Sequence, residues 1–221
     1  MIITEPSYEI IRPQQLDRLS HKSILRLIER AARTCYKSEN LMKEGSYAGL
    51  VRRLIKSGHE AMLEHATMTV LFVVDRAVAN EMVRHRIASF AQESTRYCNY
   101  EHEKFGGQIT FIRPYIFEEG SPDYETWKQA CSAAEHAYFE LLENNTPQWA
   151  RDVLPLCTKT EIVVTMNLRE WRHFFLLRAS DATGKAHPQM KQVTVPLLKQ
   201  MQEFLPEIFD DIPLPEGEVH G

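Results

Sequence analysis

The stretch "HATMTVLFVV", His65 to Val74, is rich in β-branched and aromatic residues, which predicts a buried strand. The next segment predicts a helix across Arg76 to Ala88. Further helices are expected at about Ser20 to Thr34, Ser46 to Ser57, Thr146 to Leu154, Pro122 to Glu143 and Gln189 to Glu203. Helices around one sheet indicate an α+β, or mixed α/β, fold.

Three other segments are interpreted as extended chain. A strand is predicted at Tyr8 to Arg12 ("YEIIR"). Two further extended segments are expected at Glu93 to Tyr100 and at Gln108 to Phe117. The loop between them, residues 101–107, is expected to be a mobile surface excursion. The acidic, proline-containing tail is expected to fray from about residue 210. With 221 residues, the chain is expected to form one domain, 1–221.

Composition and charge exclude several classes of protein. The formal net charge of −4 gives no overall field for holding nucleic acid or an anionic membrane. The longest apolar run, "VLFVV", is far too short to cross a bilayer, and the N-terminus lacks the pattern of a signal peptide, so we expect a cytoplasmic protein. The four cysteines form no C-x-x-C pair, which argues against a disulfide framework and a structural zinc. Glycine-rich motifs of the Rossmann and P-loop type are absent, so side chains must bind any phosphate.

A local concentration of hydrogen-bond donors occurs in "RHRIASFAQESTRY", Arg84 to Tyr97. If Arg84 and Arg86 lie on a helix with His85 between them, the three side chains point in different directions. In one interpretation Arg84 pairs with Glu81 or Asn80 and Arg86 extends to solvent. In the other, the arginines and the hydroxyls of "STRY" form a phosphate site, which is typical chemistry for such an array.

Two further segments contain candidate site residues. "HEAMLEH", His59 to His65, matches no zincin or inverzincin template, so its histidines are interpreted as helix-junction residues. In "NLREWRHFFLLRASD", Asn167 and Glu170 have the spacing of a helix N-cap pair. Arg178 then falls in the apolar stripe of that helix. It is expected either to compensate the helix C-terminus or pair with Asp181, or to meet a ligand.

Taken together, these segments resemble the flavin-dependent thymidylate synthase family. "RHRIASFAQES" matches the family's signature of R-H-R, seven residues and S, which continues into S-x-R-Y. "GHEAMLEH", "RAARTCY", "ARDVLPL" and "NLREWRHFFLLR" resemble further blocks of the family, in the right order, over roughly residues 24 to 190. The resemblance implies a single α+β domain with a central, largely antiparallel sheet flanked by helices, assembled as a homotetramer.

The resemblance also implies the reaction and its reagents. Deoxyuridine monophosphate (dUMP) is methylated to thymidine monophosphate (dTMP), methylenetetrahydrofolate supplies the carbon, and FAD reduced by NADPH supplies the reducing equivalents. The sites lie at subunit junctions, and no metal, nucleic acid or membrane is involved.

Individual residues are assigned by the same motif matches. The side chains implied to face the flavin and folate are Arg84, His85, Arg86, Gln92, Asn167, His173 and His59. Those implied to bind the nucleotide are Glu81, Arg84, Ser94, Thr95, Arg96, Arg151 and Arg178. Arg178 and Ser94 are the implied catalytic residues, with Arg178 against the uracil ring and Ser94 acting through a hydrogen bond to the substrate.

Four residues depart from the family pattern: Glu81, Gln92, Cys35 and His173. Glu81 is the most consequential, because it places a carboxylate near an anionic nucleotide. Two other classes of protein compete with the synthase interpretation. A nucleotide- or RNA-binding module could use "RHR" and "STRY", and a metal-dependent hydrolase could be built on His59, Glu64, His65 and His85. Each competitor explains one motif, whereas the synthase explains five.

Overall fold

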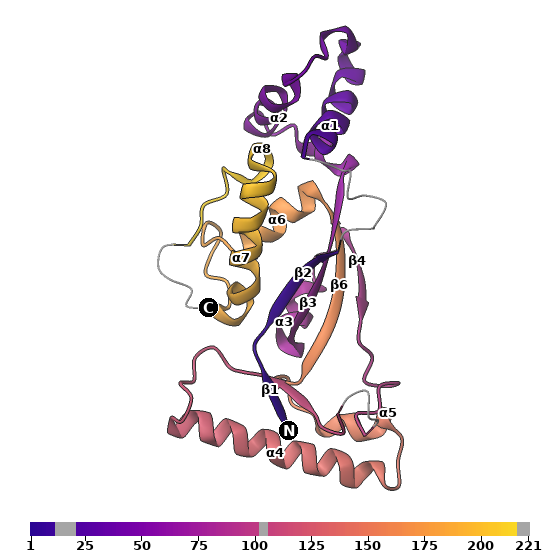
Figure 1. Ribbon diagram of the computed structural model, residues 1–221, viewed down its shortest axis with the longest axis vertical. Helices are drawn as coiled ribbons and strands as arrows, with labels where there is room; N and C mark the ends of the chain where they lie inside the picture. The colour runs from indigo at the N-terminus through magenta and orange to yellow at the C-terminus, as the bar shows by residue number, and fades with distance from the viewer. Residues whose placement is uncertain (12–20, 102–105, 216–221) are drawn as a thin grey trace. The chain divides into compact units, whose positions relative to one another are not determined.

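The computed structural model describes residues 1–11, 21–101 and 106–215, and the contacts divide the chain into two compact units (Figure 1). The first unit comprises Met1–Ser7, Phe72–Arg84 and Phe90–Val163. The second unit comprises Tyr8–Leu71, His85–Ser89 and Val164–Gly221. The grouping of all residues into one domain stays a prediction.

The main sheet is antiparallel and has the strand order β2-β3-β6-β4 (Figure 1). Its strands are β2 (Ser7–Ile11), β3 (Thr67–Asp75), β6 (Lys159–Asn167) and β4 (Ala88–Gln92). Strand β3 is the strand predicted from "HATMTVLFVV", and its buried Val70, Phe72 and Val74 alternate with more exposed residues, as the pleat of a strand requires. A separate parallel pair joins β1 (Ile2–Thr4) to β5 (Thr110–Ile112). The predicted mixed α/β fold, with an antiparallel sheet flanked by helices, is confirmed.

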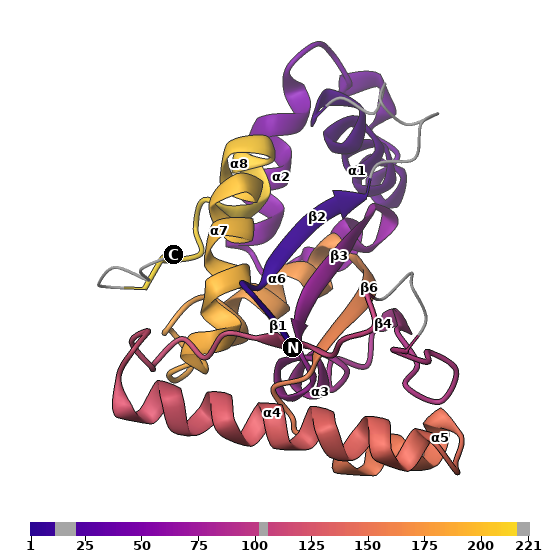
Figure 2. The same ribbon diagram turned by 60° about the horizontal axis from the view of Figure 1, so that its bottom comes forward.

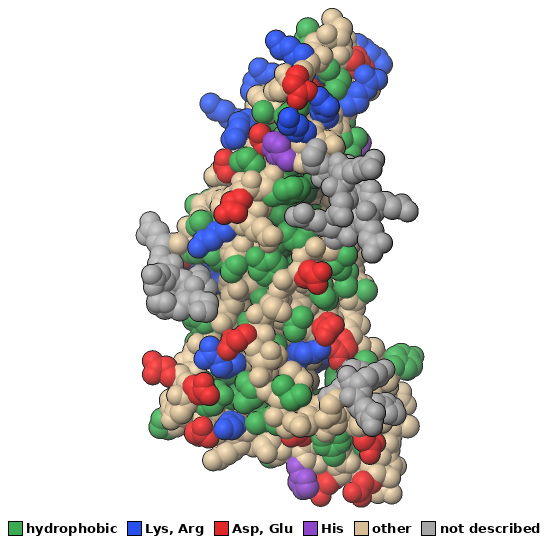
Figure 3. Space-filling model, in the orientation of Figure 1, with side chains coloured by type: hydrophobic (Ala, Val, Ile, Leu, Met, Phe, Trp, Pro, Cys, Tyr) green, Lys and Arg blue, Asp and Glu red, His purple; other side chains and the backbone are tan. Residues whose placement is uncertain are grey.

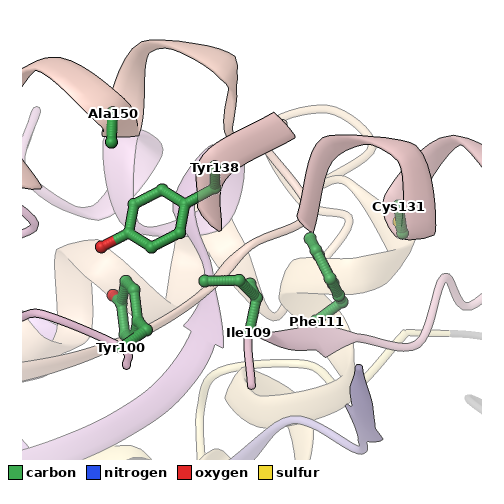
Figure 4. Packing of buried hydrophobic residues seen from close by; sticks show 6 residues of the cluster. All are labelled: Tyr100, Ile109, Phe111, Cys131, Tyr138 and Ala150. Atoms are coloured by element: carbon green, nitrogen blue, oxygen red, sulfur yellow. The ribbon is translucent and has the colours of Figure 1, made fainter. Parts of the chain in front are cut away.

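The first unit packs around the long helix α4 (Pro122–Leu142). The helix begins where Ser121 accepts a hydrogen bond from the Tyr124 amide at 3.2 Å, and Pro122 stands in its first turn, where a missing N–H costs nothing. The unit also contains α3 (Arg76–Met82), α5 (Pro147–Ala150) and the 3₁₀ helix η5 (Arg151–Val153). Figure 4 shows its core, which consists of Tyr100, Ile109, Phe111, Cys131, Tyr138 and Ala150.

The second unit is mainly helical. Its helices are α1 (His21–Tyr36), η2 (Glu39–Leu41), α2 (Ser46–Lys56), η3 (Glu60–His65), α6 (Leu168–Arg178), α7 (Pro188–Phe204) and α8 (Pro206–Phe209). Helix α7 packs against α6 (Figure 2). Trp171, Phe174 and Phe175 of α6 form an aromatic cluster that Phe209 of α8 extends. This cluster fixes α6, whose first turn and last residue contribute to the site described below.

The helix predicted from Arg76 to Ala88 is shorter than expected. Asp75 caps its start by accepting from the Val78 amide at 2.7 Å, but the helix ends at Met82. Ala88 to Gln92 instead form the edge strand β4 next to β6, so pairing in the sheet overrides the local helical pattern.

The segments expected to be extended are only partly so. Residues 94–98 form a turn, because the Ser94 carbonyl accepts from the amides of Tyr97 and Cys98, and serine favours such turns. In Gln108 to Phe117 the strand is limited to Thr110–Ile112, and Pro114, which has no amide to donate to a sheet, follows shortly after it.

The first residues of the C-terminal tail contact the rest of the second unit. Asp211 pairs with Arg172 and Ile212 is buried, so residues 211 and 212 have packing partners, and the expected fraying of the tail from about residue 210 stays a prediction. The end of the tail at 216–221 lies outside the described residues, as do Arg12, Ser20 and positions 102–105 of the predicted surface loop. Among the residues that are described, no helix combines the length and apolar character needed to span a membrane.

Candidate active site

The clearest constellation of polar side chains in the second unit joins His85 to helix α6. The helix starts at Asn167, whose Oδ1 accepts from the Glu170 amide at 2.9 Å, so the predicted N-cap is confirmed. The Glu170 carboxylate turns away from the cap and lies 3.1 Å from Nδ1 of His85. At the last residue of the helix, Nε of Arg178 donates to Nε2 of His85 at 3.3 Å. One imidazole thus connects the first turn of α6 to its final residue.

The His85 ring is buried and closely packed. The residue is 5% exposed, and its ring meets that of Phe174 at 5.0 Å and that of His173 at 5.7 Å, both edge to face. Burial lowers the pKa of His85, and the positive charge of Arg178 lowers it further, whereas Glu170 acts in the opposite direction. The burial effect prevails, so His85 is neutral near pH 7.

The arrangement of His85, Glu170 and His173 also has the residue types of a metal site, since their ligand atoms lie within 4.8 Å of one another. The contacts favour a hydrogen-bonded chain instead. Glu170 already bonds to one nitrogen of His85, and the Arg178 guanidinium, a cation, contacts the other. The hydrolase set of His59, Glu64, His65 and His85 is not gathered as a ligand group in the described part of the chain, and Glu64 bonds to Arg169 at 2.6 Å.

A pocket of about 350 Å³ lies in the second unit between α1, the end of α2 and η3. Its wall includes Tyr36, Met62 and Cys35, and its polar groups include His59 and Arg169. His59 is exposed and stands directly before η3. The chain reverses here through Gly58, whose φ of 71° lies in the left-handed region that glycine tolerates. The pocket therefore presents an apolar wall with a few polar side chains, which is typical of a small-molecule site.

Basic side chains gather on the helices beside this pocket. Figure 3 shows Lys and Arg side chains concentrated over α1 and α2, and the exposed ones include Lys22, Arg26, Arg30, Lys37, Arg52, Arg53 and Lys56. In a protein of net charge −4 this is a local positive surface. Such a surface favours anionic ligands near the pocket.

The residues predicted to bind the nucleotide gather in part in the first unit. Nη1 of Arg151, at the start of η5, donates to the hydroxyl of buried Thr95 at 3.4 Å. Thr95 belongs to the turn that begins at Ser94, and Arg96 in the same turn lies over the Tyr97 ring at 5.4 Å from its centroid. The structure thus brings together two predicted residues from separate motifs, Thr95 and Arg151.

The other predicted residues of the first unit occupy different positions. Gln92, at the end of β4, donates to the Thr160 hydroxyl at 3.2 Å. Glu81 lies in the last turn of α3, and Arg84 follows in an exposed turn. In the second unit Arg86 is exposed in a bend, while His173 is exposed on α6. Their assignments to flavin or nucleotide stay predictions.

Sequence reasoning missed the role of Glu170 and the pocket position of Arg169. Glu170 was recognised only as a capping residue, although its position on a face that also carries Trp171 and Phe174 required a buried partner. Asp181 pairs with Lys191, and the expected pairing of Arg178 with Asp181 stays a prediction. A buried glutamate on an aromatic helix was the available signal.

The fold is shared with a protein of known structure. A crystal structure of a UMP/dUMP methylase from Streptomyces cacaoi, bound with 5-Br dUMP, superimposes with a TM-score of 0.75 over 95% of this chain and 96% of that chain, at 24% identity. At this level of identity the likeness shows a shared fold.

Sequence comparison defines the family. The profile of the family described as "Thymidylate synthase complementing protein" matches residues 19–207. The flavin-dependent thymidylate synthase of Mycolicibacterium vanbaalenii is 33% identical over 204 residues, which cover 84% of this chain and 78% of the relative. That of Geobacter sulfurreducens is 31% identical over 202 residues, 85% of this chain and 84% of the relative. The chain therefore belongs to the flavin-dependent thymidylate synthase family and is an enzyme of that class.

Proposed function

We propose that this enzyme converts dUMP to dTMP, with methylenetetrahydrofolate as carbon donor and NADPH as the reductant of bound FAD. The observation that carries the proposal is the contact between His85 of the R-H-R motif and Arg178 at the end of the N-x-R segment. Two separate family motifs meet in this contact, which holds a guanidinium at the end of an aromatic helix. The cytoplasmic location stays a prediction from the sequence.

Arg178 is assigned to the uracil ring of the substrate. A guanidinium donates in a planar fork and is always charged, so it can stabilise negative charge that develops on a ring carbonyl. His85 accepts from Nε of Arg178, which is one of several N–H donors that a guanidinium carries. Electrostatic stabilisation of this kind needs no covalent nucleophile, which agrees with a hydrogen-bonding role for Ser94.

The phosphate of dUMP is assigned to the residues of the first unit. Arg151 is oriented by Thr95, and the turn that begins at Ser94 adds the hydroxyl of Ser94 and the guanidinium of Arg96. Arg84 is assigned to the nucleotide as well, and it would offset the carboxylate of Glu81 one turn earlier. Hydroxyls and guanidinium groups are the usual ligands of a phosphate monoester.

The residues of the second unit fit a flavin dinucleotide. The pocket offers an apolar wall for an aromatic ring system, and the basic surface of α1 and α2 complements a pyrophosphate. Its volume of about 350 Å³ accommodates part of such a cofactor, which supports a site completed by other subunits. His59, His85, Arg86, Asn167 and His173 are assigned to this cofactor and to the folate beside it. Arg84 and Gln92, which belong to the first unit, keep their assignment to the flavin from the motif match alone. When bound, the flavin supplies the hydride of the reductive step.

The homotetramer is part of the same proposal. Large apolar side chains are exposed near the predicted site residues, among them Ile87 at 67%, Tyr97 at 78% and Tyr36 at 76%. Such groups at the surface support burial against further copies of the chain. Sedimentation analysis of the purified protein measures this directly, and a monomer at micromolar concentration would contradict it.

The first test of the function is the visible absorption spectrum of the purified protein with added FAD. We expect a bound flavin whose absorption bleaches when NADPH and dUMP are added. Formation of dTMP should then require methylenetetrahydrofolate. A protein that binds no flavin, and instead binds nucleic acid with a steep salt dependence, would favour the competing binding module.

A further inference from the structure

Glu170 is a buried carboxylate whose side chain has no part in capping its own helix. The residue is 7% exposed, and the N-cap bond to Asn167 uses its backbone amide. A buried charge is costly unless it is hydrogen-bonded, and Glu170 bonds to Nδ1 of His85 at 3.1 Å. The hydrogen-bond partner of the Glu170 carboxylate is therefore the imidazole of His85.

The two partners of His85 determine which ring nitrogen carries the proton. A carboxylate only accepts hydrogen bonds, and a guanidinium only donates them. The neutral ring with its proton on Nδ1 is the form that satisfies both, because Nδ1–H donates to Glu170 and Nε2 accepts from Arg178. Packing against Phe174 restricts reorientation of the ring.

We propose that Glu170 is a positioning residue for the methylation reaction: by accepting the Nδ1 proton of His85, it makes Nε2 the acceptor that orients the Arg178 guanidinium. The inference rests on the proposed function. The backbone of Arg178 is held independently, because the Thr194 hydroxyl donates to its carbonyl at 2.6 Å. Glu170 and His85 thus act on the guanidinium, which the backbone contact of Arg178 leaves adjustable.

Substitution of Glu170 by glutamine tests the hydrogen bonds from Glu170 through His85 to Arg178 with little disturbance of the packing. Glutamine has nearly the same shape, and the backbone cap from Asn167 is retained. Its amide can present either an oxygen or an NH₂ group to His85. When the NH₂ group faces Nδ1, the ring proton moves to Nε2, where it opposes the N–H of Arg178. Glu170→Leu removes the acceptor altogether. Glu140→Gln is the matched control, since Glu140 forms an exposed pair with His136 at 3.5 Å.

The experiment measures kcat and KM for dTMP formation, flavin retention and the pH profile of each holoenzyme. We expect Glu170→Gln to retain flavin and lose about tenfold in kcat/KM, the usual size of such a supporting contact. The titratable and charged groups that act on His85 are Glu170, Arg178 and His173. The hydrogen bond and the charge of Glu170 raise the pKa of His85. Removal of this charge should lower that pKa and therefore shift the acid limb of the activity profile to lower pH. A purely structural role would lower activity without moving that limb.

The outcomes separate this inference from the proposed function. If the wild type forms dTMP and both Glu170→Gln and Glu170→Leu have the same kcat/KM and acid limb as the wild type, the inference is overturned and the function stands. If the wild type binds no flavin and forms no dTMP, both are overturned. Should the variants fail to fold, ¹⁵N NMR of histidine-labelled wild type reads the tautomer directly, with His85→Phe to assign the signal. Protonation of His85 at Nε2 would then refute the inference.

Discussion

The guanidinium of Arg172 forms two hydrogen bonds to the carboxylate of Asp211, at 2.6 and 2.8 Å. Arg172 is buried in α6, and it also donates to the Ile208 carbonyl and contacts Glu60 at 3.3 Å. A buried guanidinium that loses a bidentate partner is left incompletely paired. The residues after α8 are therefore held in place by a cation in the helix that carries Arg178.

Asp211→Ala is expected to lower the free energy of unfolding by about 1–3 kcal/mol, the usual cost of removing one partner of a charged hydrogen bond. Urea denaturation measures the change. The matched control is Asp210→Ala, which removes a carboxylate 3.7 Å from exposed Arg52 and should cost less than about 1 kcal/mol. Equal losses of unfolding free energy in the two variants would show that the pair with Arg172 contributes no more to stability than an exposed ion pair.

The contribution of Asp211 should depend on pH. Hydrogen bonds from Arg172 hold the pKa of Asp211 below its ordinary value of 3.8. As pH falls, the unfolded chain takes up this proton first, so the contribution is fully present above 3.8 and is lost as pH falls below it. The difference in unfolding free energy between wild type and Asp211→Ala should shrink accordingly. A difference that is constant down to the acid transition would contradict the assignment.

Local patterns in the sequence predicted local structure well. The N-cap of α6 was predictable because Asn167 and the Glu170 amide are three residues apart, and β3 was predictable from its own composition. The residues from Ala88 to Gln92 were not, because their strand exists only through pairing with β6, which is distant in the sequence. Helix and strand patterns compete over short segments, and tertiary pairing decides between them.

In the candidate site, single residues were predictable from the sequence but the contacts between them were not. The family motifs supplied Arg178 and His85 as candidate residues, but composition and spacing could not show that these side chains meet. The partners His85 and Glu170 are 85 residues apart, and Thr95 and Arg151 are 56 apart. Contacts across such separations depend on the packing of α6 and η5, which no local pattern encodes. For this reason the contact of Glu170 with His85 was not predicted.

Thr95 should contribute to nucleotide binding through Arg151. Its hydroxyl accepts from Nη1 of Arg151 at 3.4 Å, and valine has a similar shape but cannot accept. Thr95→Val is expected to weaken dUMP binding about tenfold, equivalent to about 1.4 kcal/mol, because the guanidinium loses its orienting partner. Titration of dUMP against the flavin spectrum measures the change. Thr95→Ser keeps the hydroxyl and should bind like wild type; a tenfold loss in this variant as well would point to packing instead.

Arg178→Ala should separate chemistry from cofactor binding. We expect the variant to retain flavin but to form dTMP at least about 10²-fold more slowly, the usual cost of removing a donor that stabilises developing charge. Single-turnover formation of dTMP measures this directly. Arg113→Ala, which removes a partly buried arginine paired with Glu5, is the control and should keep full activity. Unchanged turnover in Arg178→Ala would remove the role assigned to this residue.

Cys131 and Cys157 should form a disulfide under mild oxidation. Their Sγ atoms are 3.5 Å apart in the first unit, and donation from the Cys131 thiol lowers the pKa of Cys157, which favours the reactive thiolate. Diamide takes up the two thiol hydrogens as the S–S bond forms, and we expect mass spectrometry of a Cys35→Ser background to show their loss, reversed by dithiothreitol. The closed loop should raise the free energy of unfolding by up to about 3 kcal/mol. Cys131→Ser in the same background should show neither change. If the parent retains both thiols under diamide, the two sulfur atoms do not approach closely enough to react.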